Sequence, residues 1–306
     1  MQLLARWAVA AGLTFVAATA AAACHKPSDR GTVESRKVAA NIWYLYDCGG
    51  NMTALIGADG TLLVDDEFGP QTPAIVAKLK ELGGGAPRFV VNTHYHHDHT
   101  GGNASMHADG AIVIAQDNVR ARLAQVQRTP IGGKRPERIA DAGRPMITFE
   151  RSLTVHLDKQ AVRILHLPPG HTDGDSVVFF KQANVVSMGD LFFNGIYPVI
   201  DVEAGGSVGG MIRDIKKVLP YLDGKTVVIP GHGPVGDKAQ LMAFMHMMVT
   251  VRDKVRKLVD EGKTLNQVQA AHPTAAYDAR WDGHGISAAR FVAEFYYSLR
   301  PHFVGT

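Results

Sequence analysis

Residues 93–103 hold the densest group of chemically active side chains in the chain. They read Thr-His-Tyr-His-His-Asp-His-Thr-Gly-Gly-Asn, which contains the pattern His-x-His-x-Asp-His. Imidazole and carboxylate groups suit zinc and similar divalent ions. His94 and His96 lie two apart, so in an extended segment their side chains share a direction that Asp98 continues. His99 points the other way, so this loop could present ligands to two adjacent metals.

Three further candidate ligands lie downstream, each at the end of a predicted strand. They are His171, Asp190 and His232, and each has a glycine next to it or nearby. Glycine lets the backbone approach closely, as a compact metal site requires. His97 falls between the ligand positions, and we expect it to serve in packing or to face solvent.

These residues need a framework of strands and helices. A short apolar strand at 89–91 runs directly into the histidine cluster, which suits ligands held on a loop at a rigid strand end. Helical spacing predicts a helix at 71–83 and another after the capping residue Ser207. Further strands are predicted at 42–46, 52–56, 61–64, 111–115, 153–157, 162–167, 176–180, 185–188 and 226–229. The pattern predicts a mixed α/β (α+β) fold, with sheets covered by helices on their outer faces.

Composition narrows the functional class. The chain has 306 residues, of which 46% are hydrophobic and 20% charged, and this is an ordinary globular composition. The formal net charge is +3 and no long Lys/Arg run occurs. Nucleic-acid binding therefore has no electrostatic footprint, and we expect a small-molecule substrate instead.

The N-terminus has the features of a targeting segment. Residues 1–23 carry one positive charge, an apolar run and then three alanines, which predicts a cleaved signal peptide with an uncleaved anchor as the alternative. Residues 24–37 are expected to form a polar linker. Cys24 could be lipidated or could pair with Cys48 in a disulfide, and two inert thiols are the third option. We therefore expect export to the bacterial periplasm, as a soluble or lipid-tethered protein.

The order of these motifs resembles the metallo-β-lactamase superfamily over residues 38–236. The resemblance implies a four-layer αβ/βα sandwich. Apolar stripes at helical spacing predict that a C-terminal helical extension at 237–306 packs on it. The resemblance also implies two metal ions, most simply zinc, with iron or manganese as alternatives. Asp190 resembles the carboxylate that bridges both metals in glyoxalase II and related hydrolases, and Asp65 resembles an aspartate that orients a ligand histidine. By the same resemblance the first metal is held by His94, His96 and His171, and the second by Asp98, His99 and His232.

The activity implied by this resemblance is hydrolysis. Two metals about 3.5–4 Å apart can share a water and lower its pKa towards about 7, so that hydroxide attacks a carbonyl carbon. Amides, esters, thioesters and lactones are all candidate substrates. Asp98 could position the nucleophile or accept its proton. Asn194 and Tyr197 follow Asp190 closely and could either donate hydrogen bonds to an oxyanion or be ordinary loop residues.

Three alternatives remain open at the level of sequence. Export favours a true β-lactamase. Two positions argue against it: β-lactamases usually carry Cys or Ser where this chain has Asp190, and some of them carry Lys where this chain has Phe193. A di-iron oxidoreductase of the same fold typically carries Glu where this chain has His96. A non-enzymatic metal-binding protein is the third alternative. The sequence leaves the oligomeric state undetermined.

Overall fold

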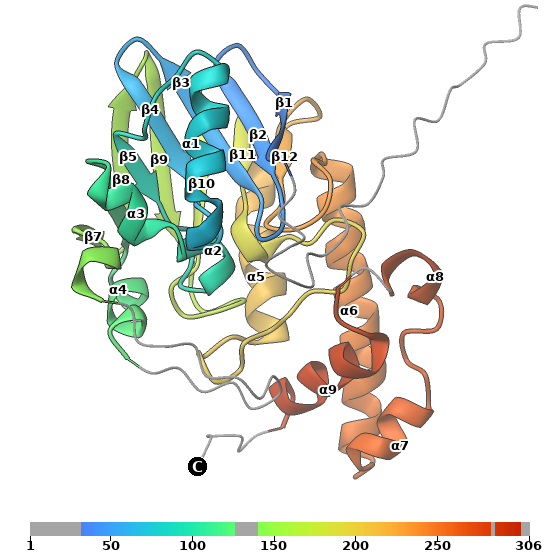
Figure 1. Ribbon diagram of the computed structural model, residues 1–306. Coiled ribbons are helices and arrows are strands. Elements are labelled where there is room, and N and C mark those ends of the chain that lie inside the picture. The colour runs from blue at the N-terminus through green and yellow to red at the C-terminus, as the bar shows by residue number, and fades with distance from the viewer. Residues whose placement is uncertain (1–31, 126–139, 283–284, 301–306) are drawn as a thin grey trace, which may run out of the picture.

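Two β-sheets lie at the centre of the protein (Figure 1). The structure is a computed structural model that describes residues 32–125, 140–282 and 285–300. The first sheet has seven strands in the order β1-β2-β3-β4-β5-β6-β7. Their bounds are β1 (Glu34–Lys37), β2 (Ile42–Tyr46), β3 (Met52–Gly57), β4 (Gly60–Val64), β5 (Phe89–Val91), β6 (Ile112–Gln116) and β7 (Ile147–Phe149). The second sheet has five strands in the order β12-β11-β10-β9-β8. Their bounds are β12 (Val227–Ile229), β11 (Val185–Ser187), β10 (Ser176–Phe180), β9 (Gln160–His166) and β8 (Ser152–Leu157).

The two sheets pack face to face because successive side chains along each strand point to opposite faces of the sheet, and apolar side chains meet on the inner faces. In β4, Leu62 and Val64 point into a core that also contains Val178 of β10 and Ile229 of β12. Leu63 points the other way, into a separate core on the outer face of the first sheet. Successive strand residues face opposite sides of a sheet, so a strand with helices on one side and a sheet on the other is apolar throughout.

Helices cover both outer faces. On the first sheet, α1 (Thr72–Glu81) and α3 (Asn103–Ala108) contribute Ile75, Leu79 and Met106 to the outer core. On the second sheet, α5 (Val208–Val218) and α6 (Lys238–Asp260) pack against the outer side chains of β10 and β11. The α/β/β/α order of layers confirms the predicted sandwich.

In the described part of the chain, four helices follow β12. They are α6, α7 (Leu265–Ala270), α8 (Asp278–Trp281) and α9 (Ala288–Ser298). Phe291 and Phe295 of α9 share one core with Phe244 of α6 and Ile215 of α5, so these helices pack directly on the sandwich. None of the helices within residues 32–125, 140–282 and 285–300 is long and apolar enough to span a membrane.

The predicted linker at 24–37 is wrong for its last residues. Glu34–Lys37 forms the edge strand β1, which pairs antiparallel with β2 in the register Glu34↔Tyr46. Backbone hydrogen bonds hold an edge strand whose side chains stay largely exposed, so a polar sequence suffices. The predicted signal peptide and Cys24 lie outside the described residues.

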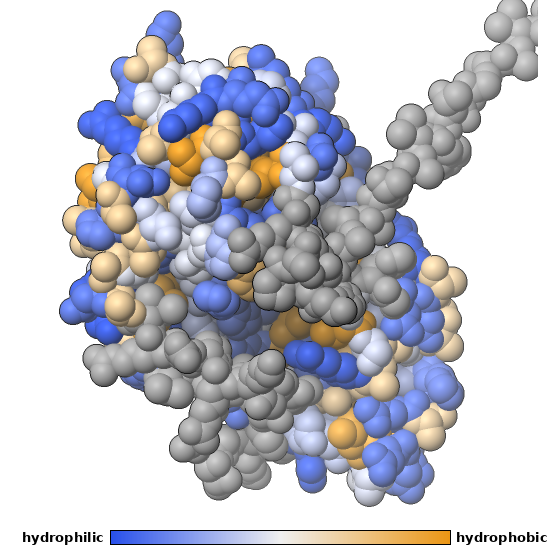
Figure 2. Space-filling model, viewed as in Figure 1, coloured by the Kyte–Doolittle hydropathy of each residue, from blue (hydrophilic) through white to orange (hydrophobic). Residues whose placement is uncertain are grey.

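The face drawn in Figure 2 is mostly hydrophilic, with apolar residues in small separate groups.

Candidate metal centre

All the predicted ligands meet at one edge of the two sheets. The loop after β5 carries His94, His96, Asp98 and His99, and short α2 (His97–Thr100) turns its last part back towards the sheet. The remaining ligands come from the loop after β9, the end of β11 and the end of β12. Two groups of side chains could each hold a metal ion. We call His94, His96 and His171 the first ligand set, and Asp98, His99 and His232 the second ligand set.

The carboxylate of Asp190 lies between the two sets and faces both. Its Oδ2 atom is 3.4 Å from His171 Nε2 and 3.7 Å from His94 Nε2. Its Oδ1 atom is 3.2 Å from His99 Nε2 and 3.5 Å from His232 Nε2. One oxygen therefore serves each set, which is the geometry of a bridging carboxylate.

Hydrogen bonds fix the tautomers of the first ligand set. His171 Nδ1 lies 2.7 Å from the Val199 carbonyl oxygen, and His96 Nε2 lies 2.9 Å from Asp201 Oδ2. Both oxygens only accept, so these ring nitrogens carry the protons. In the neutral rings, His171 Nε2 and His96 Nδ1 then present lone pairs to each other at 2.9 Å. Two facing lone pairs repel each other unless a proton or a metal ion lies between them.

The same argument applies to His94. Thr93 donates its hydroxyl to Asp65 Oδ2 at 2.8 Å, so its oxygen is left to accept from His94 Nδ1 at 3.1 Å. The proton of His94 is thus on Nδ1, and its Nε2 atom is buried without a hydrogen-bond partner. Asp190 Oδ1 is a second buried atom without a hydrogen-bond partner. Buried polar atoms of native proteins are nearly always satisfied, so these two fit a metal ion.

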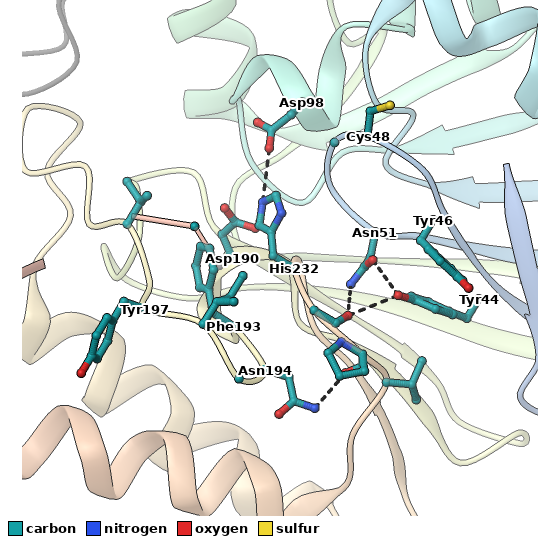
Figure 3. Close-up of a pocket in the computed structure, with 18 of the residues that line it drawn as sticks. Tyr44, Tyr46, Cys48, Asn51, Asp98, Asp190, Phe193, Asn194, Tyr197 and His232 are labelled. Atoms are coloured by element: carbon teal, nitrogen blue, oxygen red, sulfur yellow. Dashed lines mark hydrogen bonds and ion pairs between the residues drawn. The ribbon is translucent and has the colours of Figure 1, made fainter. Parts of the chain in front are cut away.

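In the second ligand set, the carboxylate of Asp65 orients His99. Asp65 Oδ2 lies 2.9 Å from His99 Nδ1, which leaves His99 Nε2 facing His232 Nε2 at 3.3 Å. Asp98 Oδ2 lies 3.2 Å from the same atom of His232 (Figure 3). Asp65 itself is buried and also accepts from the Thr93 backbone at 2.8 Å. This carboxylate–histidine pairing fixes ring orientation in metal sites and raises ligand basicity.

The electrostatics of the centre call for a cation. Burial holds the pKa of His94 well below its usual range and lowers the pKa of His171 to about 4, which keeps these ring nitrogens available as ligands. Burial also opposes charge on His232, but Asp190 and Asp98 raise its pKa to about 10. Without a metal the carboxylates of Asp98 and Asp190 hold a proton on His232, and a divalent ion bound by the same groups would take the place of that proton.

Two glycines allow this close packing. A Cβ atom at Gly50 would lie 2.1 Å from the His99 ring, and one at Gly231 would lie 2.0 Å from Asp190 Oδ1. Both distances are far below a van der Waals contact. No side chain larger than hydrogen fits at either position without moving a ligand.

Sequence reasoning missed Asp201. Its carboxylate is buried, accepts from the Tyr95 hydroxyl as well as from His96, and has a pKa below its usual range: burial opposes this shift, but His96 and Tyr95 outweigh it. No motif or periodicity links Asp201 to the histidines. Only the path of the loop before α5 brings it under His96.

A cavity of about 690 Å³ opens beside the centre. His96, Asp98, Asp190 and His232 lie on its wall with aromatic and apolar side chains. These include Tyr44, Tyr46, Phe193, Ile196 and Ile286. The ring of Phe193 stacks on that of His232, with centroids 5.2 Å apart and an interplanar angle of 17°.

Asn194 and Tyr197 also line the cavity, but their donors are directed elsewhere. Asn194 donates its amide to the Pro234 carbonyl at 2.8 Å (Figure 3). Tyr197 donates its hydroxyl to Asp278 at 2.7 Å. This geometry favours a framework role over oxyanion binding. Cys48 lines the same cavity, while Cys24 lies outside the described residues.

The comparisons with known proteins agree with this geometry. Residues 43–232 match the family model described as the metallo-beta-lactamase superfamily. The hydroxyacylglutathione hydrolase of Anaeromyxobacter dehalogenans is 29% identical over 183 residues, which cover 60% of this chain and 61% of that protein. The hydroxyacylglutathione hydrolase of Polaromonas sp. is 32% identical over 145 residues, or 47% of each chain. The chain thus spans only about half to three fifths of the length of these relatives.

Solved structures show the same fold at low sequence identity. A metallo-beta-lactamase from Pontibacter korlensis is 20% identical with a TM-score of 0.58, covering 71% of this chain and 98% of that one. The DIM-1 metallo-beta-lactamase is 18% identical with a TM-score of 0.57, covering 72% of this chain and 99% of that one. At these identities the similarity concerns the fold alone.

Proposed function

Since the chain belongs to the metallo-β-lactamase superfamily, we propose that it is a hydrolase that binds two zinc ions and cleaves carbonyl compounds. The observation that carries the proposal is the position of Asp190. One of its oxygens faces the first ligand set and the other faces the second, at 3.2 to 3.7 Å from the nearest ring nitrogens. A single carboxylate between two sets of ligands suits a pair of ions, whereas a single ion would leave one set unused.

The residues of the centre divide the work between them. When bound, two divalent ions would supply Lewis acidity at the carbonyl oxygen and lower the pKa of water. His94, His96 and His171 hold one end of the site rigidly, because each has its second ring nitrogen hydrogen-bonded. Asp98 lines the cavity with its side chain 27% exposed, so it can reach both a ligand position and an attacking water. Its carboxylate is the candidate proton acceptor.

The cavity points to a small organic substrate with an apolar portion. Its volume of about 690 Å³ and its walls of Tyr44, Tyr46 and Phe193 suit a ligand larger than a simple acetyl ester. Esters, thioesters, lactones and amides all offer the required carbonyl. The relatives named hydroxyacylglutathione hydrolases act, by their name, on hydroxyacylglutathione, which is a thioester. Thioesters are therefore the first class to test.

The test is hydrolysis by the zinc-loaded protein of a panel of thioesters, lactones, aryl esters, a cephalosporin and a carbapenem. His96→Ala removes a ligand, and His97→Ala is its matched control, because His97 is exposed and lies next to it in the same motif. We expect turnover of at least one class, lost in H96A and retained in H97A. Equal turnover by both variants would refute the assignment of the centre.

A β-lactamase is the second candidate. The metallo-beta-lactamase type 2 of Bacillus cereus is 21% identical over 232 residues, covering 84% of that protein. Asp190 at the bridging position and Phe193 stacked on His232 argue for the other carbonyl substrates. Turnover of the two β-lactams alone would reverse this order. Iron in the purified protein, with an absorbing cofactor, would favour a di-iron oxidoreductase instead.

We also propose that the protein is exported. The support is the sequence of residues 1–23 and the small residues before Cys24. Mass spectrometry of the protein from a bacterial periplasm would reveal a mature N-terminus at or near residue 24, with or without a lipid. An intact Met1 in the cytoplasmic fraction would contradict this proposal.

A further inference from the structure

The loop at residues 199–206, which we call the strap, crosses directly beneath the first ligand set. The Val199 carbonyl accepts from His171 Nδ1 at 2.7 Å, and the Asp201 backbone N–H donates to the His171 carbonyl at 3.0 Å. The Asp201 side chain accepts from His96 Nε2 at 2.9 Å. Two of the three histidines of the first set are therefore oriented by one short loop.

The strap is held from its other side by the C-terminal helices. Glu294 of α9 accepts from the backbone N–H of Ile200, with its Oε2 atom 2.7 Å from the nitrogen. One helical turn further on, Ser298 accepts from the N–H of Val208 at 3.0 Å, just after the strap ends. The distant end of the chain thus contacts the loop that orients His96 and His171.

A single peptide group connects Glu294 to His171. The carbonyl that accepts from His171 belongs to Val199, and the N–H that donates to Glu294 belongs to Ile200, so both lie in one peptide plane. The described chain has no cis peptide bond, so the C=O and the N–H of this plane point in opposite directions. A carboxylate at the N–H polarises the group and strengthens its carbonyl as an acceptor. That carbonyl in turn fixes the ring of His171 and raises its basicity as a ligand.

The burial of Glu294 shows that this contact is costly. The residue is only 1% exposed, and burial raises its pKa to about 7, although Ile200 and Arg290 partly offset the effect. Its other oxygen lies 3.2 Å from Arg290 Nε. The rest of the inward face of α9 is apolar, with Phe291, Val292 and Phe295 in the core. A buried carboxylate destabilises the fold unless hydrogen bonds and a charge partner compensate it, so its place on an apolar face points to a role for the contact with Ile200.

We propose that Glu294 is a positioning residue for the metal centre, acting on His171 through the Val199–Ile200 peptide. This inference rests on the proposed metal site. It predicts that the C-terminal helices contribute to metal affinity without touching a ligand.

The test compares Glu294→Ala, Glu294→Gln and the control Val292→Ala in zinc affinity and in the visible spectrum of the cobalt-substituted protein. Val292 is buried on the same helix and packs by apolar contact, so V292A removes core packing and leaves the strap's hydrogen bonds intact. We expect E294A to bind zinc about tenfold more weakly and to shift the cobalt spectrum, because loss of an outer partner typically costs about 10–100-fold. E294Q keeps an acceptor for Ile200 and should stay within about threefold of the wild type, as should V292A.

The outcomes separate the two proposals. A wild type that binds no metal would overturn the proposed function and this inference together. A wild type that binds zinc, with E294A unchanged in affinity and spectrum, would overturn the inference alone. If E294A does not fold, the wild type suffices: adding zinc should move the NMR resonance of the Ile200 amide, and an unmoved resonance would contradict the connection to His171.

Discussion

The two ligand sets use similar residue types but are held in different ways. In the first set every ring is hydrogen-bonded at its second nitrogen, to Thr93, Asp201 and Val199. In the second set only His99 has such a partner, namely Asp65. Within residues 32–125, 140–282 and 285–300, His232 Nδ1 has no side-chain or backbone hydrogen bond, and packing against Phe193 holds the ring instead.

This contrast predicts different roles for the first and the second ligand set in metal binding and in substrate access. The second set is also the more open, since the side chains of Asp98 and His232 are 27% and 22% exposed, whereas in the first set only His96 is, at 22%. Outer hydrogen bonds orient ligands and strengthen metal binding. We therefore expect the first set to bind its ion more tightly and the second to be the side where substrate and water enter.

The largest effect should come from Asp190→Ala, because Asp190 is the residue that both sets share. Metal content should fall below two ions per chain and hydrolysis should fall by more than about 100-fold, beyond what an outer partner contributes. Metal analysis and initial rates measure both, with the exposed Asp109→Ala as control. If D190A binds two ions and hydrolyses substrate at a near-normal rate, Asp190 does not bridge the two ligand sets.

A matched pair of ligand variants tests the contrast itself. His171→Ala removes a hydrogen-bonded ring of the first set, and His232→Ala removes the packed ring of the second set. We expect H232A to keep about one tightly bound ion per chain and H171A to keep less, because the remaining first-set ligands are pre-oriented. Equilibrium dialysis against zinc distinguishes the two. Equal losses would show that the hydrogen bonds do not make the sets different.

Each outer carboxylate bonds directly to a ring of one set, and Asp65 also reaches His94 indirectly through the Thr93 hydroxyl. Asp201→Asn weakens the acceptor for His96, and Asp65→Asn weakens the acceptor for His99. Each change should lower zinc affinity about 10–100-fold, D201N in the tighter binding event and D65N in the weaker one. Calorimetric titration resolves the two events. If D201N weakened the weaker binding event and D65N the tighter one, the second set would be the tighter site.

The smallest effect concerns the scaffold under the first set. Asp214 of α5 is buried, its Oδ2 atom has no hydrogen-bond partner, and burial raises its pKa to about 6 despite Arg213. An acid with a raised folded pKa contributes stability below its unfolded pKa, and this is lost as pH rises through about 6. Asp214→Asn should thus be more stable than the wild type at pH 8 by roughly 1–2 kcal/mol, with no gain near pH 4. Denaturant unfolding at both pH values checks this, and a gain at pH 4 would contradict it.

The sequence predicted which side chains would meet at the centre, because the pattern that marks them is local. The motif at 93–103 and the strand-end positions of His171, Asp190 and His232 depend on residue type and short spacing alone. Strands with apolar residues on both faces were also identifiable. The polar edge strand β1 was not, because its pairing depends on backbone hydrogen bonds rather than on an apolar pattern.

The residues that orient the ligands could not be predicted in the same way. Asp201 and Glu294 reach His96 and His171 only through the course of the strap and the packing of α9. Tyr197 shows the converse. It lies near Asp190 in sequence, yet its ring stacks on Phe291 and its hydroxyl bonds to Asp278. Spacing along the chain indicates which residues could be ligands, whereas tertiary contacts decide which side chains support them.

The proposed function requires two metal ions, one on each side of Asp190. Anomalous scattering at the zinc edge from crystals of the zinc-loaded protein tests it most directly. The account predicts two peaks about 3.5–4 Å apart, one beside each ligand set, with the stronger occupancy at the first set. A single peak, or two peaks that do not share Asp190, would contradict it.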